Sequence, residues 1–149
     1  MKINAFADVS LRAMMVLAAA AEGELLTTQS IADAVGTPYN HVSKAMAKLR
    51  ELGLIDVERG RNGGSRLSGA GREATVGQLL RALDTRTDPA DCVAAAGACP
   101  LINECRLRSA LGRAREAFYR ELDDLIVASL PTSRQMNPVF AAIGLRPGL

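Results

Sequence analysis

The sequence predicts a mainly helical fold that carries one small β-hairpin. Three observations lead to this prediction. Apolar residues recur with helical spacing through most of residues 1–84, glycines and threonines separate the helical segments, and a glycine-rich turn divides two short runs of strand-forming residues. The chain has 149 residues, of which 48% are hydrophobic and 23% charged. This length and composition are those of one ordinary globular domain.

The first expected helix covers residues 8–22. Asp8 can serve as its N-cap, because a carboxylate accepts hydrogen bonds from the backbone of the first turn, and Gly23 ends the apolar repeat. The apolar run is too short to cross a bilayer, and it lacks the basic flank and cleavage site of a secretory signal. We therefore expect a cytoplasmic protein with no membrane association, in a compartment that keeps thiols reduced.

Two further helices with a tight turn between them are expected at about residues 28–51. Thr27 or Thr28 can begin the first of them, since both can cap a helix, Gly36 can end it, and Pro38 suits the first turn of the second. Two helices of these lengths, joined this closely, make a helix-turn-helix.

Strand-forming residues follow at about residues 54–68, on either side of the glycine-rich turn Arg59–Gly64. The segment Gly69–Gly71 is expected to break the chain before another helix at 75–84. A helix-turn-helix followed by a basic hairpin is a winged helix, and we expect residues 1–84 to form this DNA-binding domain. The alternative is a small α+β domain whose hairpin is merely solvated. Element order, lengths and charge all favour the winged helix.

Positive charge is concentrated on the expected helix-turn-helix and wing. Between Pro38 and Arg72 seven basic residues stand against three acidic ones, although the net charge of the whole chain is only +2. A local excess of this kind is typical of a face that binds phosphate groups. Double-stranded operator DNA is therefore the expected partner.

Candidate DNA contacts follow from the position of each residue in this motif. Proteins of this kind place the amino-terminal end of the second motif helix in the major groove, where Asn40 and His41 can bond to base edges. Lys44 and Lys48 would neutralise phosphates. Tyr39 can instead pack on the motif core, and His41, the sole histidine, has no partner at helical spacing that suggests a metal site. The predicted contacts are Thr28, Gln29, Ser30, Tyr39, Asn40, His41, Ser43, Lys44, Lys48, Arg59, Arg61, Asn62 and Arg66.

Beyond residue 84 the pattern changes twice. Residues 85–103 lose all periodicity, whereas residues 104–130 are predicted to form one long helix of about 40 Å. Its apolar residues step by three and four, and no other element of so small a chain is long enough to cover that stripe. We therefore expect it to be a dimerisation helix that crosses its counterpart in a homodimer. Packing against residues 8–22 could also cover part of the stripe, and the tail, 131–149, shows no clear structure.

Three cysteines, Cys92, Cys99 and Cys105, lie within fourteen residues of each other. Thiolates at this density bind zinc or an iron–sulfur cluster. Zinc sites more often use closer spacings, so the wider gaps favour a cluster, with zinc and free thiols as alternatives. An enzyme is not expected, because the sequence offers no nucleophile–base pair, phosphate-binding glycine loop or paired acids.

The chain resembles the Rrf-two superfamily of bacterial winged-helix regulators. Within it, the chain is most similar to the NsrR-like branch of nitric-oxide-sensing iron–sulfur repressors, which are related to the IscR regulators. The resemblance rests on the start FADVSLRAMMVLA, the motif TTQSIADAVGTPYNHVSKAMAKLRELGLI, the wing RGRNGGSRLS and three cysteines before a long final helix. It covers about residues 1–130. It implies a winged-helix dimer whose cluster-binding loop, 85–103, lies near the partner subunit and the DNA-binding domain.

The resemblance also implies a ligand set and an effector. IscR-like relatives have a histidine three residues after the last cysteine, where this chain has Arg108, whereas NsrR-like proteins can use a carboxylate near the amino terminus of the partner subunit. Asp8 matches that position, although it could also serve only as a helix cap. The implied cofactor is a [4Fe-4S] cluster on Cys92, Cys99, Cys105 and Asp8, and nitric oxide is the implied signal that releases the operator. A [2Fe-2S] redox or cluster-status regulator and a zinc-stabilised DNA-binding or interaction protein are the alternatives. The first cysteine gap is one residue longer than the usual family spacing.

Overall fold

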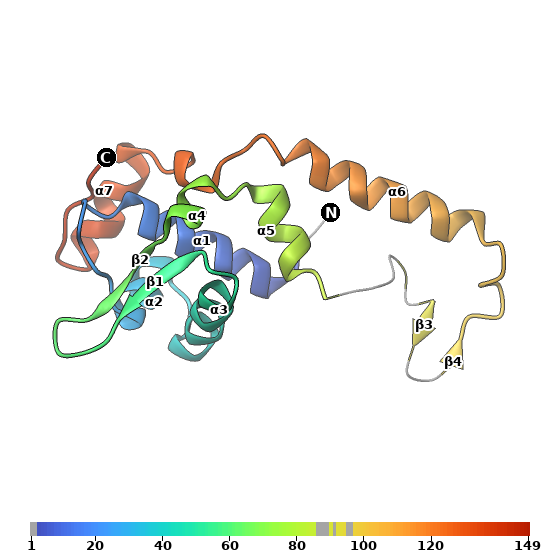
Figure 1. Ribbon diagram of the computed structural model, residues 1–149, viewed down its shortest axis with the longest axis horizontal. Helices are drawn as coiled ribbons and strands as arrows, with labels where there is room; N and C mark the ends of the chain where they lie inside the picture. The colour runs from blue at the N-terminus through green and yellow to red at the C-terminus, as the bar shows by residue number, and fades with distance from the viewer. Residues whose placement is uncertain (1–2, 86–89, 91, 95–96) are drawn as a thin grey trace.

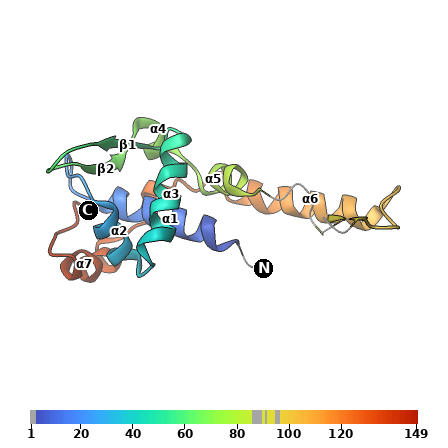
Figure 2. The same cartoon turned by 90° about the horizontal axis from the view of Figure 1, so that it is seen from below.

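The computed structural model describes residues 3–85, 90, 92–94 and 97–149. It has two parts, a body of packed helices and an arm that extends from it (Figures 1 and 2). The body consists of helices α1–α5, the wing hairpin, a 3-10 turn and helix α7. The arm consists of helix α6 and the small hairpin that precedes it.

Helix α1 spans Ala5–Ala19 and begins earlier than the sequence predicts. Its N-cap is Asn4, whose side chain accepts a 2.7 Å hydrogen bond from the backbone amide of Ala7. The prediction that Asp8 caps this helix is therefore wrong, and Asp8 lies within its first turn. The helix also ends before Glu22, because Ala20 is already in an extended conformation.

The helix-turn-helix is confirmed. Helix α2 spans Thr28–Val35 and helix α3 spans Tyr39–Glu51. Thr27 caps α2 through a 3.0 Å bond from the amide of Ser30, and Gly36 ends α2 in the left-handed conformation. Both helices pack against α1, and the buried side of α3 consists of the residues Val42, Ala45, Met46 and Leu49.

The wing is confirmed as well. Strand β1 (Ile55–Glu58) pairs antiparallel with strand β2 (Gly64–Leu67). Leu26, just before α2, extends this sheet through two backbone hydrogen bonds with Ser65, of 3.0 and 2.8 Å. This pairing fastens the base of the wing to the helix-turn-helix.

The prediction that Gly69–Gly71 breaks the chain is wrong, because these residues form the short helix α4, Gly69–Glu73. Ser68 caps it. A Cβ atom at Gly71 would lie 1.9 Å from the carbonyl oxygen of Leu54, so this glycine permits a close approach between α4 and the start of the wing.

Helix α5 spans Val76–Leu83, as predicted, and begins with a capping box formed by Thr75 and Gln78. The helix predicted for residues 104–130 is shorter: α6 spans Arg106–Glu121. After Glu121 the chain turns back toward α5 and makes long-range backbone bonds, from the Val76 amide to Leu125 and from Val127 to Ala74. These bonds compete with continuation of the helix and explain why it ends. A 3-10 turn, η1, follows at Val127–Ser129.

The prediction that the tail lacks structure is wrong. Helix α7 spans Ser133–Ala142, with Thr132 as its N-cap, and its Phe140 side chain is fully buried. Close to the chain end, the Gly148 amide donates a 2.8 Å bond to Ala19, at the end of α1. The tail is thus packed onto the body.

Within the segment 85–103, predicted as an irregular loop, the structure contains a small antiparallel hairpin. Its strands are β3 (Val93–Ala94) and β4 (Gly97–Ala98). In the part of the chain that the structure describes, no helix has the length and apolar character needed to cross a membrane.

Candidate functional site

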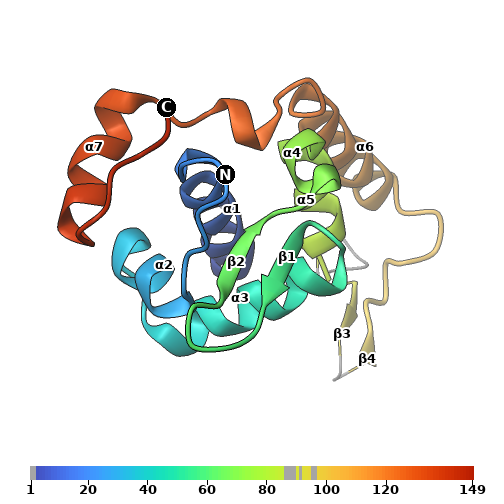
Figure 3. The same cartoon turned by 60° about the vertical axis from the view of Figure 1, so that its left-hand side comes forward.

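The first turn of α3 faces solvent. Tyr39 is 47% exposed, and Asn40 and His41 are exposed too, whereas Val42 is fully buried. Tyr39 is therefore not among the buried residues of the motif core. Helix α3 packs against strand β1 of the wing, and Figure 3 shows the wing hairpin and α3 on the same side of the body. Thr28, Ser30 and Ser43 are half-buried, and Gln29 and Asn62 are exposed.

The predicted phosphate-binding cations fall into two groups. Lys48 is paired with Glu51 at 2.7 Å, and Arg66 is paired with Glu58 at 2.5 Å. Lys44, Arg59 and Arg61 form no ion pair with any described residue, and all three are exposed. Exposed ion pairs contribute at most about 1 kcal/mol, so those of Lys48 and Arg66 would be weak competitors for a phosphate.

The wing tip has a backbone that needs glycine. Gly60 has a φ of +118°, and a Cβ atom at Gly63 would lie 2.2 Å from the carbonyl oxygen of Glu58. The tight turn that results presents Arg59 and Arg61 at its end.

Two of the three cysteines are neighbours across the small hairpin of the arm. Cys92 precedes β3 and Cys99 follows β4, and the Cys99 amide donates a 2.9 Å bond to the Cys92 carbonyl. Residues opposite each other on an antiparallel ladder have side chains on the same face, with Cβ atoms about 5 Å apart. Both side chains are half-exposed, and neither forms a disulfide.

Cys105 lies apart from this pair, at the N-cap of α6. Its sulfur accepts a 3.5 Å hydrogen bond from the backbone amide of Arg108. Glu104, just before it, adopts the left-handed conformation with a φ of 55°. No group of three metal-ligating side chains is assembled among the described residues, so the structure brings two cysteines together but not all three.

Asp8 lies on α1, remote in sequence from the cysteines, and is paired with Arg12 at 2.8 Å. It lines a groove of about 480 Å³ between α1, α2 and α7. The walls of this groove are mainly apolar and include Leu11, Met15, Val35, Met136 and Val139.

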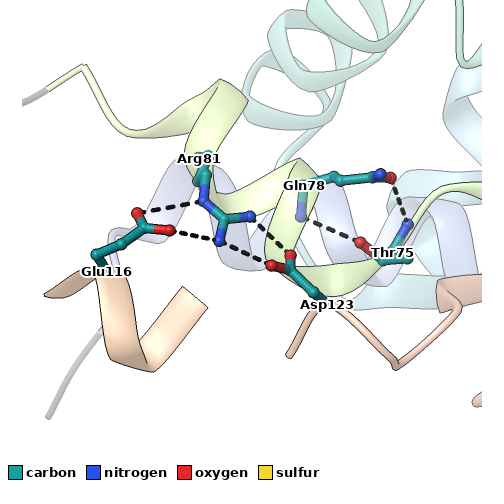
Figure 4. Close-up of polar contacts among 5 residues, drawn as sticks. All are labelled: Thr75, Gln78, Arg81, Glu116 and Asp123. Carbon is teal, nitrogen blue, oxygen red and sulfur yellow. Dashed lines mark hydrogen bonds and ion pairs between the residues drawn. The ribbon is translucent and has the colours of Figure 1, made fainter. Parts of the chain in front are cut away.

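Sequence reasoning missed a polar cluster that joins α5 to α6 (Figure 4). The guanidinium of Arg81 binds both carboxylate oxygens of Asp123, at 2.6 and 2.8 Å, and also Glu116 at 2.9 Å. These bonds raise the pKa of Arg81 and lower the pKa of Asp123 and of Glu116, so all three groups stay charged at neutral pH. The partners are 35 and 42 residues apart in sequence, and no local pattern links them.

The helix-turn-helix, the wing and the exposed first turn of α3 together define a winged-helix protein of the DNA-binding class. The model of the Rrf2 family, described as iron-dependent transcriptional regulator, matches residues 3–132. The chain therefore belongs to the Rrf2 family of transcription regulators.

Curated relatives agree with this assignment. The chain is 41% identical over 148 residues to the HTH-type transcriptional repressor NsrR of Streptomyces coelicolor, covering 99% of each chain. It is 37% identical over 135 residues to the HTH-type transcriptional regulator NsrR of Geobacillus kaustophilus, covering 90% of this chain and 92% of the relative. These relatives are transcription regulators and not enzymes.

Solved structures share the fold at lower sequence identity. IscR of T. potens superimposes with a TM-score of 0.67 and 22% identity, covering 87% of this chain and 85% of that one. CymR of B. subtilis, the global cysteine regulator, gives a TM-score of 0.66 and 24% identity, covering 87% and 95%. The similarity to these two extends over most of each chain.

Proposed function

We propose that this chain is a homodimeric transcription repressor that senses nitric oxide through a [4Fe-4S] cluster and releases its operator in response. The observation that carries the proposal is the arrangement of the cysteines. The hairpin holds Cys92 and Cys99 side by side. Cys105 follows Cys99 by six residues and is the N-cap of α6. The relatives named NsrR and the iron-dependent family model support the same interpretation.

The donor set fits an iron–sulfur cluster. Three thiol sulfurs from one short segment are soft ligands of the kind such clusters require. Cys105 stands at a helix N-terminus, where backbone amides favour a negatively charged ligand. Exposed Arg106 and Arg113, with half-buried Arg108, add positive charge around it. When bound, the cluster would supply iron that can react with nitric oxide.

Asp8 is proposed as the fourth ligand, contributed by a second copy of the chain. Its carboxylate is partly exposed on the first turn of α1. Within the described residues it is held by an exposed ion pair with Arg12, so little free energy opposes its release. Helix α1 packs along α3, the helix proposed to read DNA. A change in what Asp8 binds can therefore be transmitted through one helix to the DNA-binding face.

A second copy is proposed because α6 has no helix or strand packed against most of its length among the described residues. All residues of α6 are described, and it buries only Tyr119. Leu107 is 66% exposed and Leu111 also faces solvent. An isolated helix of this length is marginally stable in water, so burial against a second α6 would stabilise it. Crossed arms would place two winged helices on one palindromic operator.

On DNA, we propose that Asn40 and His41 contact base edges. Lys44, Arg59 and Arg61 are the first cations to bind phosphate or the minor groove, because they have no ion pair to give up within the described residues. The remaining predicted contacts, which are half-buried, internally bonded or uncharged, are Thr28, Gln29, Ser30, Tyr39, Ser43, Lys48, Asn62 and Arg66.

The proposal is tested by anaerobic purification followed by absorption spectroscopy, with counts of iron and sulfide per chain. About four iron and about four sulfide per chain, as in a [4Fe-4S] cluster, support the proposal. About two of each per chain, as in a [2Fe-2S] cluster, or zinc without sulfide, would overturn it. Asp8→Ala should still acquire the cluster but lose it faster, whereas the control Asp124→Ala, an exposed residue after α6, should match the unmodified chain.

A further inference from the structure

The attachment of α6 to the body is confined to its last turns. Of its 16 residues, all described, only Tyr119 is buried, and the helix against which α6 packs is α5. Figure 1 shows the rest of α6 extending away from the body. Within the described residues, the contact between α5 and the end of α6 is therefore where α6 is held against the body.

Arg81 lies at the centre of that contact (Figure 4). Its fork donates two parallel hydrogen bonds to Asp123, of 2.6 and 2.8 Å, and a third of 2.9 Å to Glu116. The guanidinium carbon also lies 5.4 Å from the centre of the Tyr119 ring. A planar fork that binds a carboxylate with two bonds fixes direction as well as distance, which a lysine cannot do.

The backbones at this contact are close together. A Cβ atom at Gly77 would lie 2.2 Å from Asp123 Oδ1 and 2.4 Å from the Tyr119 carbonyl oxygen. The Gly77 amide donates a 3.0 Å bond to Leu122, and the Tyr119 hydroxyl donates to the carboxylate of Asp84. Because hydrogen bonds surround a close contact, α6 has little freedom to slide or tilt on α5.

This joint is connected to the DNA-binding face through packed helices. Helix α5 buries Leu79, Leu80 and Leu83 and packs against α1, which packs in turn against α3. The orientation of α6 relative to α3 is therefore set where α6 meets α5.

We propose that Arg81 is a positioning residue that fixes the angle between α6 and the DNA-binding domain, and thereby selects the spacing between operator half-sites. The inference rests on the proposed homodimer through α6. The helix is about 24 Å long, so a tilt of about 10° would move its far end by about 4 Å. That displacement exceeds the rise of about 3.4 Å per base pair. A small change of angle is thus enough to place the second recognition helix out of register.

The test compares Arg81→Met with Arg81→Lys and a matched control, Arg134→Met, whose arginine is exposed on α7. The probe is a palindromic duplex selected by the unmodified protein from randomised DNA, together with versions that have one base pair inserted or deleted at the centre. Affinity for each duplex is measured with anaerobically purified protein. Sedimentation reports the dimer, and circular dichroism reports the fold.

We expect Arg81→Met to remain folded and dimeric and to lose about tenfold in affinity for the selected duplex, while its preference for that spacing falls by a similar factor. The affinity and spacing preference of Arg81→Lys should lie between those of Arg81→Met and those of the unmodified protein. Arg134→Met should match the unmodified protein. A dimeric Arg81→Met that keeps the original spacing preference would overturn the inference, whatever its affinity. If the unmodified protein sediments as a monomer on DNA and in solution, the proposed homodimer fails instead. Should Arg81→Met not fold, Asp123→Asn is subjected to the same spacing test with the same criteria.

Discussion

The body and the arm of this molecule differ in where their stability comes from. Among the residues whose burial is described, every buried apolar side chain except Tyr119 belongs to the body. The arm instead exposes large apolar side chains, with Leu101 at 76% and Leu107 at 66%. The body can therefore fold around its own core. The described part of the arm has no comparable core, and we propose that a second subunit and a metal cluster stabilise it.

The largest expected effect lies in the body. Leu49→Ala removes a fully buried side chain from α3 and should lower the free energy of unfolding by about 2–5 kcal/mol. The matched change in the arm, Leu101→Ala, should alter it by less than about 0.5 kcal/mol. Urea unfolding of both variants measures this difference. Equal destabilisation would show that the arm has a core of its own.

A glycine in each region sharpens the same contrast. Gly71→Ala places a Cβ 1.9 Å from the Leu54 carbonyl oxygen, so it should destabilise the body by about 1–3 kcal/mol. A Cβ atom at Gly112, on α6, would meet no described residue outside its own turn of helix within 4 Å. Gly112→Ala should therefore be tolerated and should favour the helix by up to about 1 kcal/mol. Thermal unfolding of the two variants gives the comparison, and the reverse order of stability would contradict it.

The exposed stripe of the arm should matter for association and not for folding of the body. Leu107→Ala should raise the dissociation constant of the dimer about tenfold, because part of a leucine side chain would no longer be buried at the interface. The urea midpoint of the body should stay unchanged. The control is Leu125→Ala, a half-exposed leucine outside the arm. Sedimentation equilibrium measures both variants. A dimer constant unaffected by Leu107→Ala would place the interface elsewhere.

The smallest effect concerns the joint between the two regions. Hydrogen bonds from Arg81 hold the pKa of Asp123 and of Glu116 below the ordinary value. Since both pKa values are lower in the folded state than in the unfolded chain, their contribution is present above an unfolded carboxyl pKa of about 4 and is lost as the pH falls through the folded values.

Asp123→Asn should thus be less stable than the unmodified chain at neutral pH, and the difference should shrink as the pH falls through that window. Urea unfolding across this pH range, with Asp124→Asn as the exposed control, measures it. A difference that is the same at every pH would argue against a contribution from the charge of Asp123.

The elements predicted correctly are those defined by neighbours in sequence. Thr27 and Gly36 bound α2, Pro38 precedes α3, and the glycine-rich turn bounds the wing, so caps and turns alone place the helix-turn-helix and hairpin. The outward direction of Asn40 and His41 follows from the buried face of α3, whose apolar positions have helical spacing.

The elements predicted wrongly depend on contacts between distant residues. Helix α6 ends at Glu121, not near Leu130, because the following segment makes backbone bonds to residues 74–77. Nothing local in the sequence shows that Gly71 fits beneath Leu54.

At two further places, the start of α1 and the tail, the sequence contained a signal for the observed structure, but a neighbouring residue favoured another prediction. Asn4 and Asp8 are both good caps, and only the structure shows that the helix begins at the earlier residue. In the tail, Met136 and Phe140 have helical spacing behind the capping residue Thr132, but Pro138 lies between them and obscures the helix.

The position of Cys92 opposite Cys99 on the small hairpin could not be predicted from the sequence, which shows only the number and spacing of the cysteines. The hairpin between them has two residues in each strand, too short to produce an alternating pattern. The roles of Asp8 and of the three cysteines in binding a cluster stay predictions, to be tested by the iron and sulfide content of the protein.

The central claim is tested most directly by operator affinity before and after nitric oxide. Anaerobically purified protein is titrated with its selected duplex, then again after treatment, beside a Cys99→Ser variant. We predict that nitric oxide weakens binding of the unmodified protein by at least about tenfold and leaves the affinity of Cys99→Ser unchanged. An unmodified protein that contains the cluster and binds the duplex equally well before and after nitric oxide would contradict the account.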